Sequence, residues 1–305
     1  MMTRQGLAGG VSLQLEPLQT TEAHAYWRVF LSGRTDLPTG DLKIHLDRYL
    51  GLTPEEQRSH FSAKKEGRII GTLRLGPSEI SGFSIDPSFA PETATVLLKA
   101  VDLLRAGGAT AIVAHFEDRY EPAFASLGFR RVFARMRMEA PTRKVAPPKG
   151  LTLQPPEEDE VLGLTKFFVD AYEGHIEQQY GMHTGSDDEW RGYVGGLFKG
   201  DSGQYLPDAS YVALEGDRIV GAILVTYWMG MPLVAELAVA KDRRGRGIGR
   251  ALLEAAMGRL AGRDEPRVAL YVTVGNDPAT NLYRSIGFTQ VGGQSVTSRL
   301  ESQGT

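Results

Sequence analysis

The chain has 305 residues, of which 42% are hydrophobic and 23% charged, and its formal net charge is −3 at pH 7. This length exceeds one ordinary domain, and the composition is that of a globular protein. The slightly acidic balance argues against a dedicated nucleic-acid-binding surface, which needs an excess of basic side chains. Because the chain has no cysteine, disulfides, thiolate metal sites and a cysteine nucleophile are excluded.

We expect a cytoplasmic protein without a membrane anchor. The first 17 residues lack the continuous apolar stretch of a signal peptide. No window reaches the roughly 18 uncharged apolar residues that a membrane-spanning helix needs.

The chain is predicted to consist of two halves joined by a linker. Segment 140–150 combines three prolines, basic side chains and a final glycine, which is typical of an exposed linker. We therefore assign one domain to 1–140, the linker to 141–150 and a second domain to 151–305.

Repeated sequence supports this division. Segments 67–71 (GRIIG) and 217–221 (DRIVG) are similar strand signals, and segment 124–129 (FASLGF) is similar to 283–288 (YRSIGF). The spacing between the copies drifts by nine residues, from 150 to 159, as loop insertions would cause. Two related domains in tandem are the economical explanation.

The second half is a mixture of predicted helices and strands, which makes the fold class α+β. Apolar spacing, β-branched runs and turn residues define these elements. In chain order they are a strand at 151–154, a helix at 157–172, a hairpin of strands 209–214 and 218–228, a strand at 233–240, a helix at 250–257, a strand at 267–274, a helix at 278–285 and a final strand pair from 288 onward.

The most informative segment is the glycine-rich turn 241–249, KDRRGRGIG, between a predicted strand and a helix. Glycines let the backbone approach a ligand closely and adopt conformations barred to other residues. Unpaired N–H groups at the helix start, together with the helix dipole, favour an anion. Arg244, Arg246 and Arg250 add forked donors suited to phosphate oxygens. The turn is therefore predicted to bind a pyrophosphate.

Three other readings of this turn compete. A solvated surface turn explains the arginines but not three alternating glycines between apolar elements. A dinucleotide-binding turn needs G-x-G-x-x-G and an acidic residue at the end of the next strand, whereas Asp264 and Glu265 precede that strand. A nucleotide-triphosphate loop needs a Gly-Lys-Ser/Thr ending, which is absent.

Two blocks of sequence resemble the GNAT superfamily of N-acetyltransferases. The pattern R-x-x-G-x-G at 244–249 resembles its acetyl-CoA signature, and segment 270–288 resembles its second conserved block. The resemblance implies two tandem GNAT-like domains, each with a central mixed, mostly antiparallel sheet flanked by helices. It also implies acetyl-CoA as co-substrate and no metal.

The same resemblance assigns roles to individual residues. The strand before the turn would pair its main chain with the pantetheine arm, while the turn and helix start would hold the pyrophosphate. The implied cofactor-binding residues are Leu237, Ala238, Val239, Arg244, Gly245, Arg246, Gly247, Ile248, Gly249, Arg250, Asn276, Ala279 and Tyr283. Tyr283 matches a tyrosine that often protonates the departing CoA thiolate. Its alternative is a core tyrosine on an amphipathic helix.

The general base is less well defined. Glu236, on the same strand, is the candidate carboxylate, either as base or as a water-positioning group. Related glutamates commonly lie at other registers, and a shift of one residue moves a side chain to the opposite face unless a bulge restores it. A packing role for Glu236 stays open. Tyr271 fills a position where some relatives place a glutamate.

The acceptor is expected to bind against the first helix of the second half and the segments after it. Segments 170–180 and 187–189 interleave carboxylates with aromatic rings, which suits a cationic amine. A solvated helix face and loop is the simpler explanation for most of these residues. His175 is a candidate base or ligand, and Trp228 is expected either to wall the pocket or to pack.

The first half has the same outline without the chemistry. Segment 86–95 offers neither arginine nor glycine where the cradle should be, and its Glu92 would repel phosphate. Phe124 stands in the place of Tyr283. A degenerate copy in a tandem protein is similar to the arrangement of mycothiol synthase.

We therefore expect an acetyltransferase that passes acetyl directly from acetyl-CoA to a primary amine of a small molecule or peptide. A non-catalytic acetyl-CoA-binding module is one alternative, and use of another acyl-CoA or a hydroxyl acceptor is another. We expect no nucleic-acid partner, no membrane partner, and a monomer or homodimer.

Overall fold

A computed structural model describes residues 13–37, 40–145, 151–157, 160–181 and 185–301 of the chain. The chain forms two compact units, Met1–Val132 with Ser295–Thr305, and Phe133–Gln294. These divisions fall inside two strands and not in the predicted linker, of which residues 146–150 lie outside the described residues. In the described part of the chain no helix is long and apolar enough to cross a bilayer.

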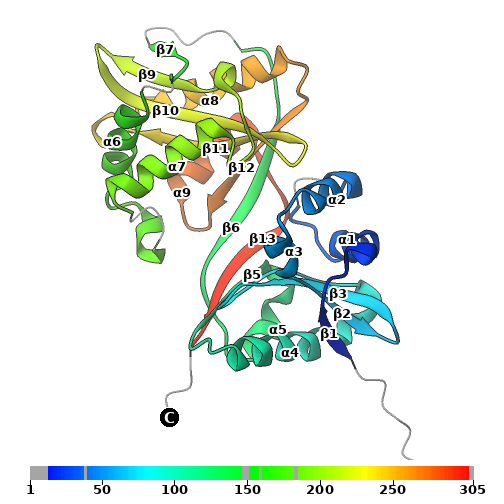
Figure 1. Ribbon diagram of the computed structural model, residues 1–305. Helices are drawn as coiled ribbons and strands as arrows, with labels where there is room; N and C mark the ends of the chain where they lie inside the picture. Colours follow the sequence, from blue (N-terminus) through cyan, green and yellow to red (C-terminus); the bar gives the residue numbers. More distant parts are fainter. Residues whose placement is uncertain (1–12, 38–39, 146–150, 158–159, 182–184, 302–305) are drawn as a thin grey trace, which may run out of the picture. The chain divides into compact units, whose positions relative to one another are not determined.

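The first unit has a mixed sheet with the strand order β1-β2-β3-β4-β5-β13. All neighbours are antiparallel except β4 and β5, which are parallel. Helices α1 to α3 lie on one face of this sheet and α4 and α5 on the other (Figure 1). The bounds are β1 Gln14–Pro17, α1 Ala23–Ser32, α2 Leu42–Leu50, α3 Pro54–Arg58, β2 His60–Lys65, β3 Arg68–Leu75, β4 Glu79–Ile85, α4 Thr93–Ala106, β5 Ile112–Glu117 and α5 Glu121–Ser126.

The second unit repeats this plan with the order β6-β12-β11-β10-β9-β7, and short β8 also pairs with β10. Here β11 and β12 are the parallel neighbours. The bounds are β6 Arg130–Pro141, β7 Thr152–Gln154, α6 Val161–Tyr172, α7 Asp187–Lys199, β8 Gln204–Tyr205, β9 Tyr211–Glu215, β10 Arg218–Trp228, β11 Met231–Val239, α8 Ile248–Ala261, β12 Arg267–Thr273, α9 Asp277–Ile286 and β13 Thr289–Leu300. The predicted mixed, mostly antiparallel sheets are confirmed.

Each unit is closed by the last strand of the other half of the sequence. β6 pairs with β12 from Arg267↔Pro141 to Thr273↔Arg135, although β6 belongs to the first half of the chain. The end of β13 pairs with β5 from Ser295↔Glu117 to Leu300↔Ile112. The repeated halves have therefore exchanged their final strands.

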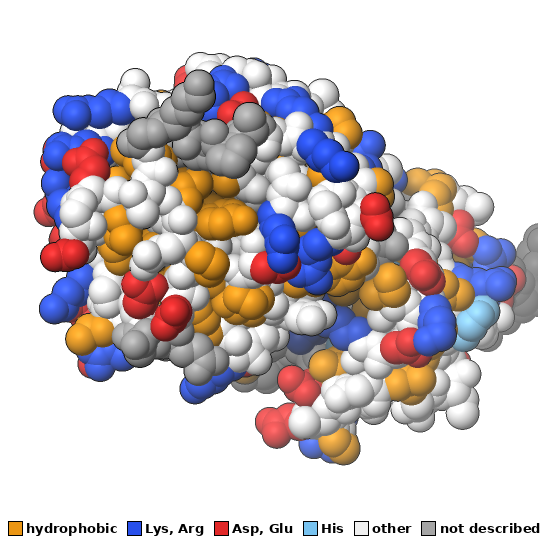
Figure 2. All heavy atoms as spheres, turned by 90° about the horizontal axis from the view of Figure 1, so that it is seen from above, with side chains coloured by type: hydrophobic (Ala, Val, Ile, Leu, Met, Phe, Trp, Pro, Cys, Tyr) orange, Lys and Arg blue, Asp and Glu red, His pale blue; other side chains and the backbone are white. Residues whose placement is uncertain are grey.

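The core of the second unit lies on both faces of its sheet. Side chains of α8 and α9, including Leu252 and Ile286, pack on one face. Side chains of α6 and α7, including Phe168 and Trp190, pack on the other. On the surface drawn in Figure 2, Lys and Arg side chains lie among Asp and Glu side chains and apolar patches.

The elements of the second half follow the predicted order, with two differences. The predicted final strand pair is wrong, because β13 runs from Thr289 to Leu300 as one strand. Gly292 has φ +72° and interrupts the regular backbone without reversing the chain. Helix α7, which the sequence analysis left unassigned, begins with a capping box between Ser186 and Glu189.

We predict that Gly221→Ala destabilises the second unit. A Cβ at Gly221 would lie 2.8 Å from Ile248 Cγ2 and 2.9 Å from Leu252 Cδ1, so α8 would have to move away from β10. Such overpacking costs about 1–3 kcal/mol, measurable by urea unfolding. Gly192→Ala is the control, because a Cβ on this exposed helical glycine meets nothing within 4 Å. It should stabilise by about 0.5–1 kcal/mol. Equal unfolding midpoints for the two variants would contradict the packing argument.

Candidate active site

The site begins where β11 and β12 separate. They pair over only two residue pairs, starting at Leu233↔Ala269. Directly afterwards the β10–β11 register shifts, which leaves Ala235 as a bulge. Beyond it, the edge of β11 from Leu237 to Val239 lines a pocket of about 1200 Å³. Main-chain donors and acceptors along such an open edge suit an amide-containing ligand laid beside the strand.

This pocket lies within the second unit and gathers nearly all the predicted site residues. Those that line it are Glu236, Leu237, Ala238, Val239, Arg244, Gly245, Gly247, Ile248, Gly249, Arg250, Asn276, Ala279 and Tyr283. Arg246 is exposed beside the turn and does not line the pocket. The roles assigned to these residues stay predictions, but the structure brings their side chains and backbone together.

The three glycines of the turn differ in their structural reasons. Gly245 and Gly247 have φ +75° and +82°, a region that L side chains rarely adopt, and Gly247 is the N-cap of α8. A Cβ on either would meet nothing within 4 Å, so this space is open. Gly249 is already helical, and a Cβ there would lie 3.3 Å from Leu282 Cδ2. Two glycines shape an open turn, and the third allows close packing.

The predicted phosphate-binding arginines also differ from one another. Arg244 donates to the carbonyls of Ala171 at 2.6 Å and Val239 at 3.3 Å, so its guanidinium joins the end of α6 to β11. Arg250 donates to Ser285 Oγ at 2.6 Å. The main chain at the start of α8 remains the feature of the turn best suited to a diphosphate, because the first N–H groups of a helix have no intrahelical partner.

Tyr283 lies on α9, lines the pocket and is 8% exposed. Burial raises the pKa of its phenol, and the nearby carboxylates of Glu236 and Glu177 raise that pKa further. The hydroxyl therefore keeps its proton at neutral pH and remains available as a donor.

Glu236 is buried on β11, directly after the bulge at Ala235. Its carboxylate accepts hydrogen bonds from the hydroxyls of Tyr172 at 2.7 Å and Tyr193 at 2.9 Å. Burial is the main cause of the raised pKa of both phenols, and Glu236 is the second. The Glu236 carboxylate lies in the pocket, where Tyr172 of α6 and Tyr193 of α7 hold it. The bulge at Ala235 is the kind of irregularity that the sequence analysis named as a way to restore the register of Glu236.

A second carboxylate, Glu177, lies beside this centre. It is buried, accepts a hydrogen bond from the hydroxyl of Thr273, and pairs with Arg135 at 3.5 Å. Glu177, Thr273 and Arg135 all line the pocket. The sequence analysis included Glu177 only as one carboxylate in segment 170–180 and named neither Thr273 nor Arg135 individually.

The other candidates named from the sequence have mainly structural contacts. His175 Nδ1 accepts from the Glu177 N–H at 3.4 Å, and its Nε2 lies 3.2 Å from Asn276 Nδ2. Both ring nitrogens thus have polar neighbours, which disfavours His175 as a base. Asn276 also caps α9 by accepting from the Ala279 N–H. Trp228, outside the pocket lining, packs near Gly203.

Comparison with known proteins identifies the family. Residues 183–288 match the model of the Acetyltransferase (GNAT) family. A mycothiol acetyltransferase from Acidothermus cellulolyticus is 30% identical over 246 residues, which cover 74% of this chain and 75% of that protein. The chain belongs to the GNAT family of acetyltransferases. Family membership implies acetyl-CoA as the acyl donor.

One further relative matches a shorter part of the chain, and two solved structures match nearly all of it. N-alpha-acetyltransferase 30 of Schizosaccharomyces pombe is 33% identical over 87 residues, covering 27% of this chain and 58% of that protein. A tandem GNAT protein from the clavulanic acid biosynthesis pathway has 15% identity and a TM-score of 0.63, covering 96% of this chain and all of the other. A GCN5-related N-acetyltransferase from Sphaerobacter thermophilus has 18% identity, a TM-score of 0.71 and 95% coverage of both chains. These structures show a shared tandem GNAT fold.

The first GNAT-like copy has the same strand divergence without the same side chains. β4 and β5 also pair over only two residue pairs before they separate. Gly71 pairs with Ile85 in the first copy as Gly221 pairs with Val239 in the second, so Ile85 corresponds to Val239. Counting three residues back along each strand, Gly82 stands at the position of Glu236. Phe124, which is fully buried, corresponds to Tyr283 in the repeated sequence segments 124–129 and 283–288. Both candidate catalytic groups are therefore missing.

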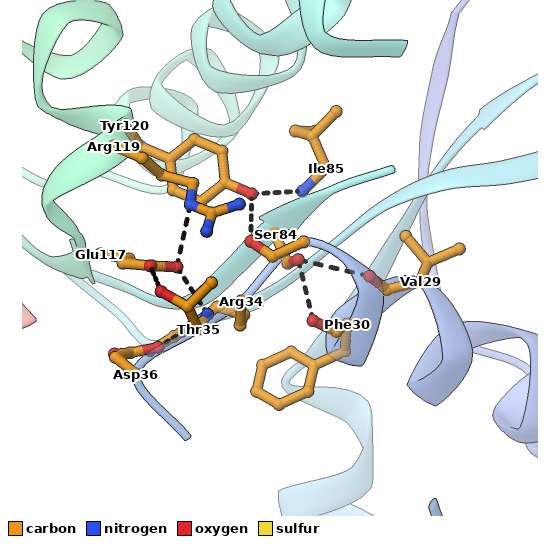
Figure 3. Close-up of polar contacts among 11 residues, drawn as sticks. Val29, Phe30, Arg34, Thr35, Asp36, Ser84, Ile85, Glu117, Arg119 and Tyr120 are labelled. Carbon is orange, nitrogen blue, oxygen red and sulfur yellow. Dashed lines mark hydrogen bonds and ion pairs between the residues drawn. The ribbon is translucent and has the colours of Figure 1, made fainter. Parts of the chain in front are cut away.

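The first unit's own residues occupy the open edge of β4. The Tyr120 hydroxyl accepts from the Ile85 N–H at 3.0 Å (Figure 3). It donates to the Gly33 carbonyl at 2.8 Å. A Cβ at Gly33 would lie 2.5 Å from the Ile85 carbonyl oxygen, so this backbone approach is close. Glu117 accepts from the Thr35 N–H at 3.1 Å and closes the same cluster. The Ile85 N–H at the end of β4 is thus bonded to a side chain of the same unit.

We predict that Gly247→Val weakens CoA binding by about tenfold or more. Its side chain would stand in the open turn where backbone must approach the diphosphate. Gly216→Val is a matched control, because Gly216 also has positive φ and open space but lies outside the pocket. Both variants carry similar backbone strain, so isothermal titration should show the loss only for Gly247→Val. An equal loss in both would assign the effect to strain alone.

Proposed function

We propose that the second unit transfers acetyl from acetyl-CoA to a primary amine of a small molecule or peptide, directly and in a ternary complex. The observation that carries this proposal is the meeting of four features in one pocket: an open strand edge, a glycine-capped helix start, a buried phenol and a buried carboxylate. The name of the N-alpha-acetyltransferase relative supports an amine acceptor.

In this mechanism the thioester lies along β11, whose N–H groups polarise its carbonyl. The amine attacks the carbonyl carbon, and the C–S bond breaks as the tetrahedral intermediate collapses. Tyr283 gives its proton to the departing sulfur. Its raised pKa means that the phenol is protonated at neutral pH, so the proton is present at that step.

Glu236 is the group that receives the amine. The amine arrives mostly as an ammonium ion and must lose a proton before or during attack. Two tyrosine hydroxyls fix the carboxylate, and Glu236 lines the pocket beside Tyr283. Glu236 therefore binds the cationic amine and takes up its proton.

We also propose that the first copy does not bind acetyl-CoA. The Ile85 N–H, which would face the pantetheine arm, already donates a hydrogen bond to the Tyr120 hydroxyl. The segment that replaces the cradle contains Asp86, which pairs with Arg68 at 2.8 Å, and Glu92. A stoichiometry of one CoA per chain in titration is expected, and two per chain would contradict this.

Two alternatives remain distinguishable. A binding module would hold acetyl-CoA but release no free thiol with any amine. A transferase for another acyl group or a hydroxyl acceptor would release thiol only with a different donor or acceptor. A matrix of acyl-CoAs against amines and alcohols, read by thiol release and product mass, separates all three.

We predict that Tyr283→Phe lowers kcat by about 10²-fold or more, the range expected for loss of a general acid. Its Kd for acetyl-CoA should change little, because the ring is retained. Steady-state kinetics and titration calorimetry measure the two quantities. Tyr227→Phe is the control, since Tyr227 bonds only locally to the Gly230 carbonyl outside the pocket. Parallel losses of kcat and affinity would make Tyr283 a binding residue.

The pH dependence follows from the raised pKa of Tyr283. A raised pKa keeps the acid form present as the pH rises, and its function is lost only above that pKa. The kcat profile should therefore show no descending limb below pH 10, the ordinary phenol value, from this residue. A descending limb of the kcat profile below pH 10 that disappears in Tyr283→Phe would show that the phenol ionises in the working pH range. That result would contradict the raised pKa of Tyr283.

A further inference from the structure

We propose that Tyr193 is a positioning residue, whose hydroxyl holds the Glu236 carboxylate in place and keeps it ionised so that Glu236 can take up the proton of the amine. The inference rests on the proposed amine acetylation, because it concerns the base of that reaction. It gives α7 a part in the chemistry, although α7 lies outside both sequence blocks that resemble the GNAT superfamily.

The Glu236 carboxylate receives one phenol donor on each of its two oxygens. Tyr172 of α6 donates to Oε2 at 2.7 Å, and Tyr193 of α7 donates to Oε1 at 2.9 Å. All three residues line the same pocket. Since each oxygen is held from a different helix, rotation of the carboxylate about its last bond would disturb both hydrogen bonds. The plane of the carboxylate is therefore fixed relative to the pocket.

The same hydrogen bonds act on the charge of Glu236. This residue is 6% exposed, and burial by itself favours the neutral form of a carboxylic acid. A phenol that donates to a carboxylate oxygen stabilises the ionised form, because the acceptor oxygen carries the negative charge. A glutamate that keeps its own proton cannot serve as a base. The two phenols thus oppose the effect of burial.

Tyr193 is suited to this donor role because its phenol holds its proton. Burial is the main cause of the raised pKa of Tyr193, and the charge of Glu236 is the second. Smaller opposing effects on this pKa come from Arg135, which lowers it, and from Glu177, which raises it. Arg135 and Glu177 form an ion pair with each other at 3.5 Å. The hydroxyl of Tyr193 therefore stays a donor at neutral pH.

Other titratable side chains surround this centre. Tyr283 on α9 senses the charge of Glu236 through its raised pKa, after the larger effect of burial. The remaining titratable residues of the pocket lining are His175, Glu189, Arg243, Arg244, Arg250 and Tyr271. All of them are retained in the variants below, so their influence on Glu236 is common to the proteins compared.

Tyr193 can be altered with less disturbance than Tyr172. The ring of Tyr172 is half-buried and lies 5.0 Å from the ring of His175 and 5.2 Å from that of Trp190, between centres. Tyr193 is 39% exposed, and its ring centre lies 5.9 Å from that of Trp190. Phenylalanine at position 193 keeps this ring contact and removes only the hydroxyl, so Tyr193→Phe isolates the hydrogen bond.

We expect Tyr193→Phe to move the acidic limb of the kcat/KM profile for one amine to higher pH by about one unit, at saturating acetyl-CoA. The lost hydrogen bond stabilised the ionised carboxylate, so Glu236 should give up its proton only at a higher pH. The loss of activity should be largest on the acidic side and should shrink as the pH rises. A loss of equal size at every pH would overturn the inference.

Tyr211→Phe is the matched control. The Tyr211 hydroxyl donates to the Asp208 carbonyl at 3.0 Å, and Tyr211 lies outside the pocket lining. This variant should keep the pH profile of the unaltered protein. Urea unfolding and the Kd for acetyl-CoA show that each variant is folded and binds the donor.

A double-mutant cycle tests whether Tyr193 acts through Glu236. Glu236→Gln removes the base, and Tyr193→Phe is then added to it. If the hydroxyl acts on the carboxylate, the second change should lower the residual rate by much less than it lowers the rate of the unaltered protein on the acidic side. An equal loss in both backgrounds would make Tyr193 a packing residue and overturn the inference.

The ionisation of Glu236 can also be followed without turnover. Protein labelled with ¹³C at its glutamate carboxyl carbons is titrated by NMR, and Glu236→Gln identifies the signal. The midpoint of this signal should rise by about one pH unit in Tyr193→Phe. An unchanged midpoint would overturn the inference and leave amine acetylation standing. A raised midpoint without thiol release from any amine would support the effect of Tyr193 on Glu236 and overturn the transferase.

Discussion

In each unit, two parallel strands pair over two residue pairs and then separate, which leaves the main chain of one strand without its neighbour. Its N–H and C=O groups need new partners once the ladder ends, because unpaired buried polar groups are costly. In the second unit β11 separates from β12 and its edge lines an open pocket. In the first unit β4 separates in the same way, and Tyr120 occupies the Ile85 N–H. The end of the separated strand thus lines a pocket in the second unit, whereas in the first unit its Ile85 N–H is bonded to a side chain.

The local features of the site were readable from the sequence because they depend on neighbouring residues. Helix periodicity, the glycine turn and the cap at Gly247 each arise within a few positions of the chain. Arg244 shows the limit of such reading. The arginines near the glycines suggested hydrogen-bond donors to a phosphate group. The last carbonyls of α6 also need hydrogen-bond donors, and Arg244 donates to the carbonyl of Ala171.

Features built from distant segments could not be predicted in this way. Tyr193 reaches Glu236 from 43 positions away, and Thr273 reaches Glu177 from 96 positions away. Nothing in either local pattern specifies the partner, because periodicity reports which face is buried and not what lies opposite. For the same reason, the sequence of β6 gave no sign that this strand pairs with β12 of the other half.

The exchange of final strands makes the second unit depend on the first half of the sequence. β6 lies between β13 and β12 in the strand order and carries Arg135, which lines the pocket of the second unit. Deleting the first half of the sequence would therefore also remove a strand and a pocket residue from the second unit. The second half by itself would be an incomplete unit.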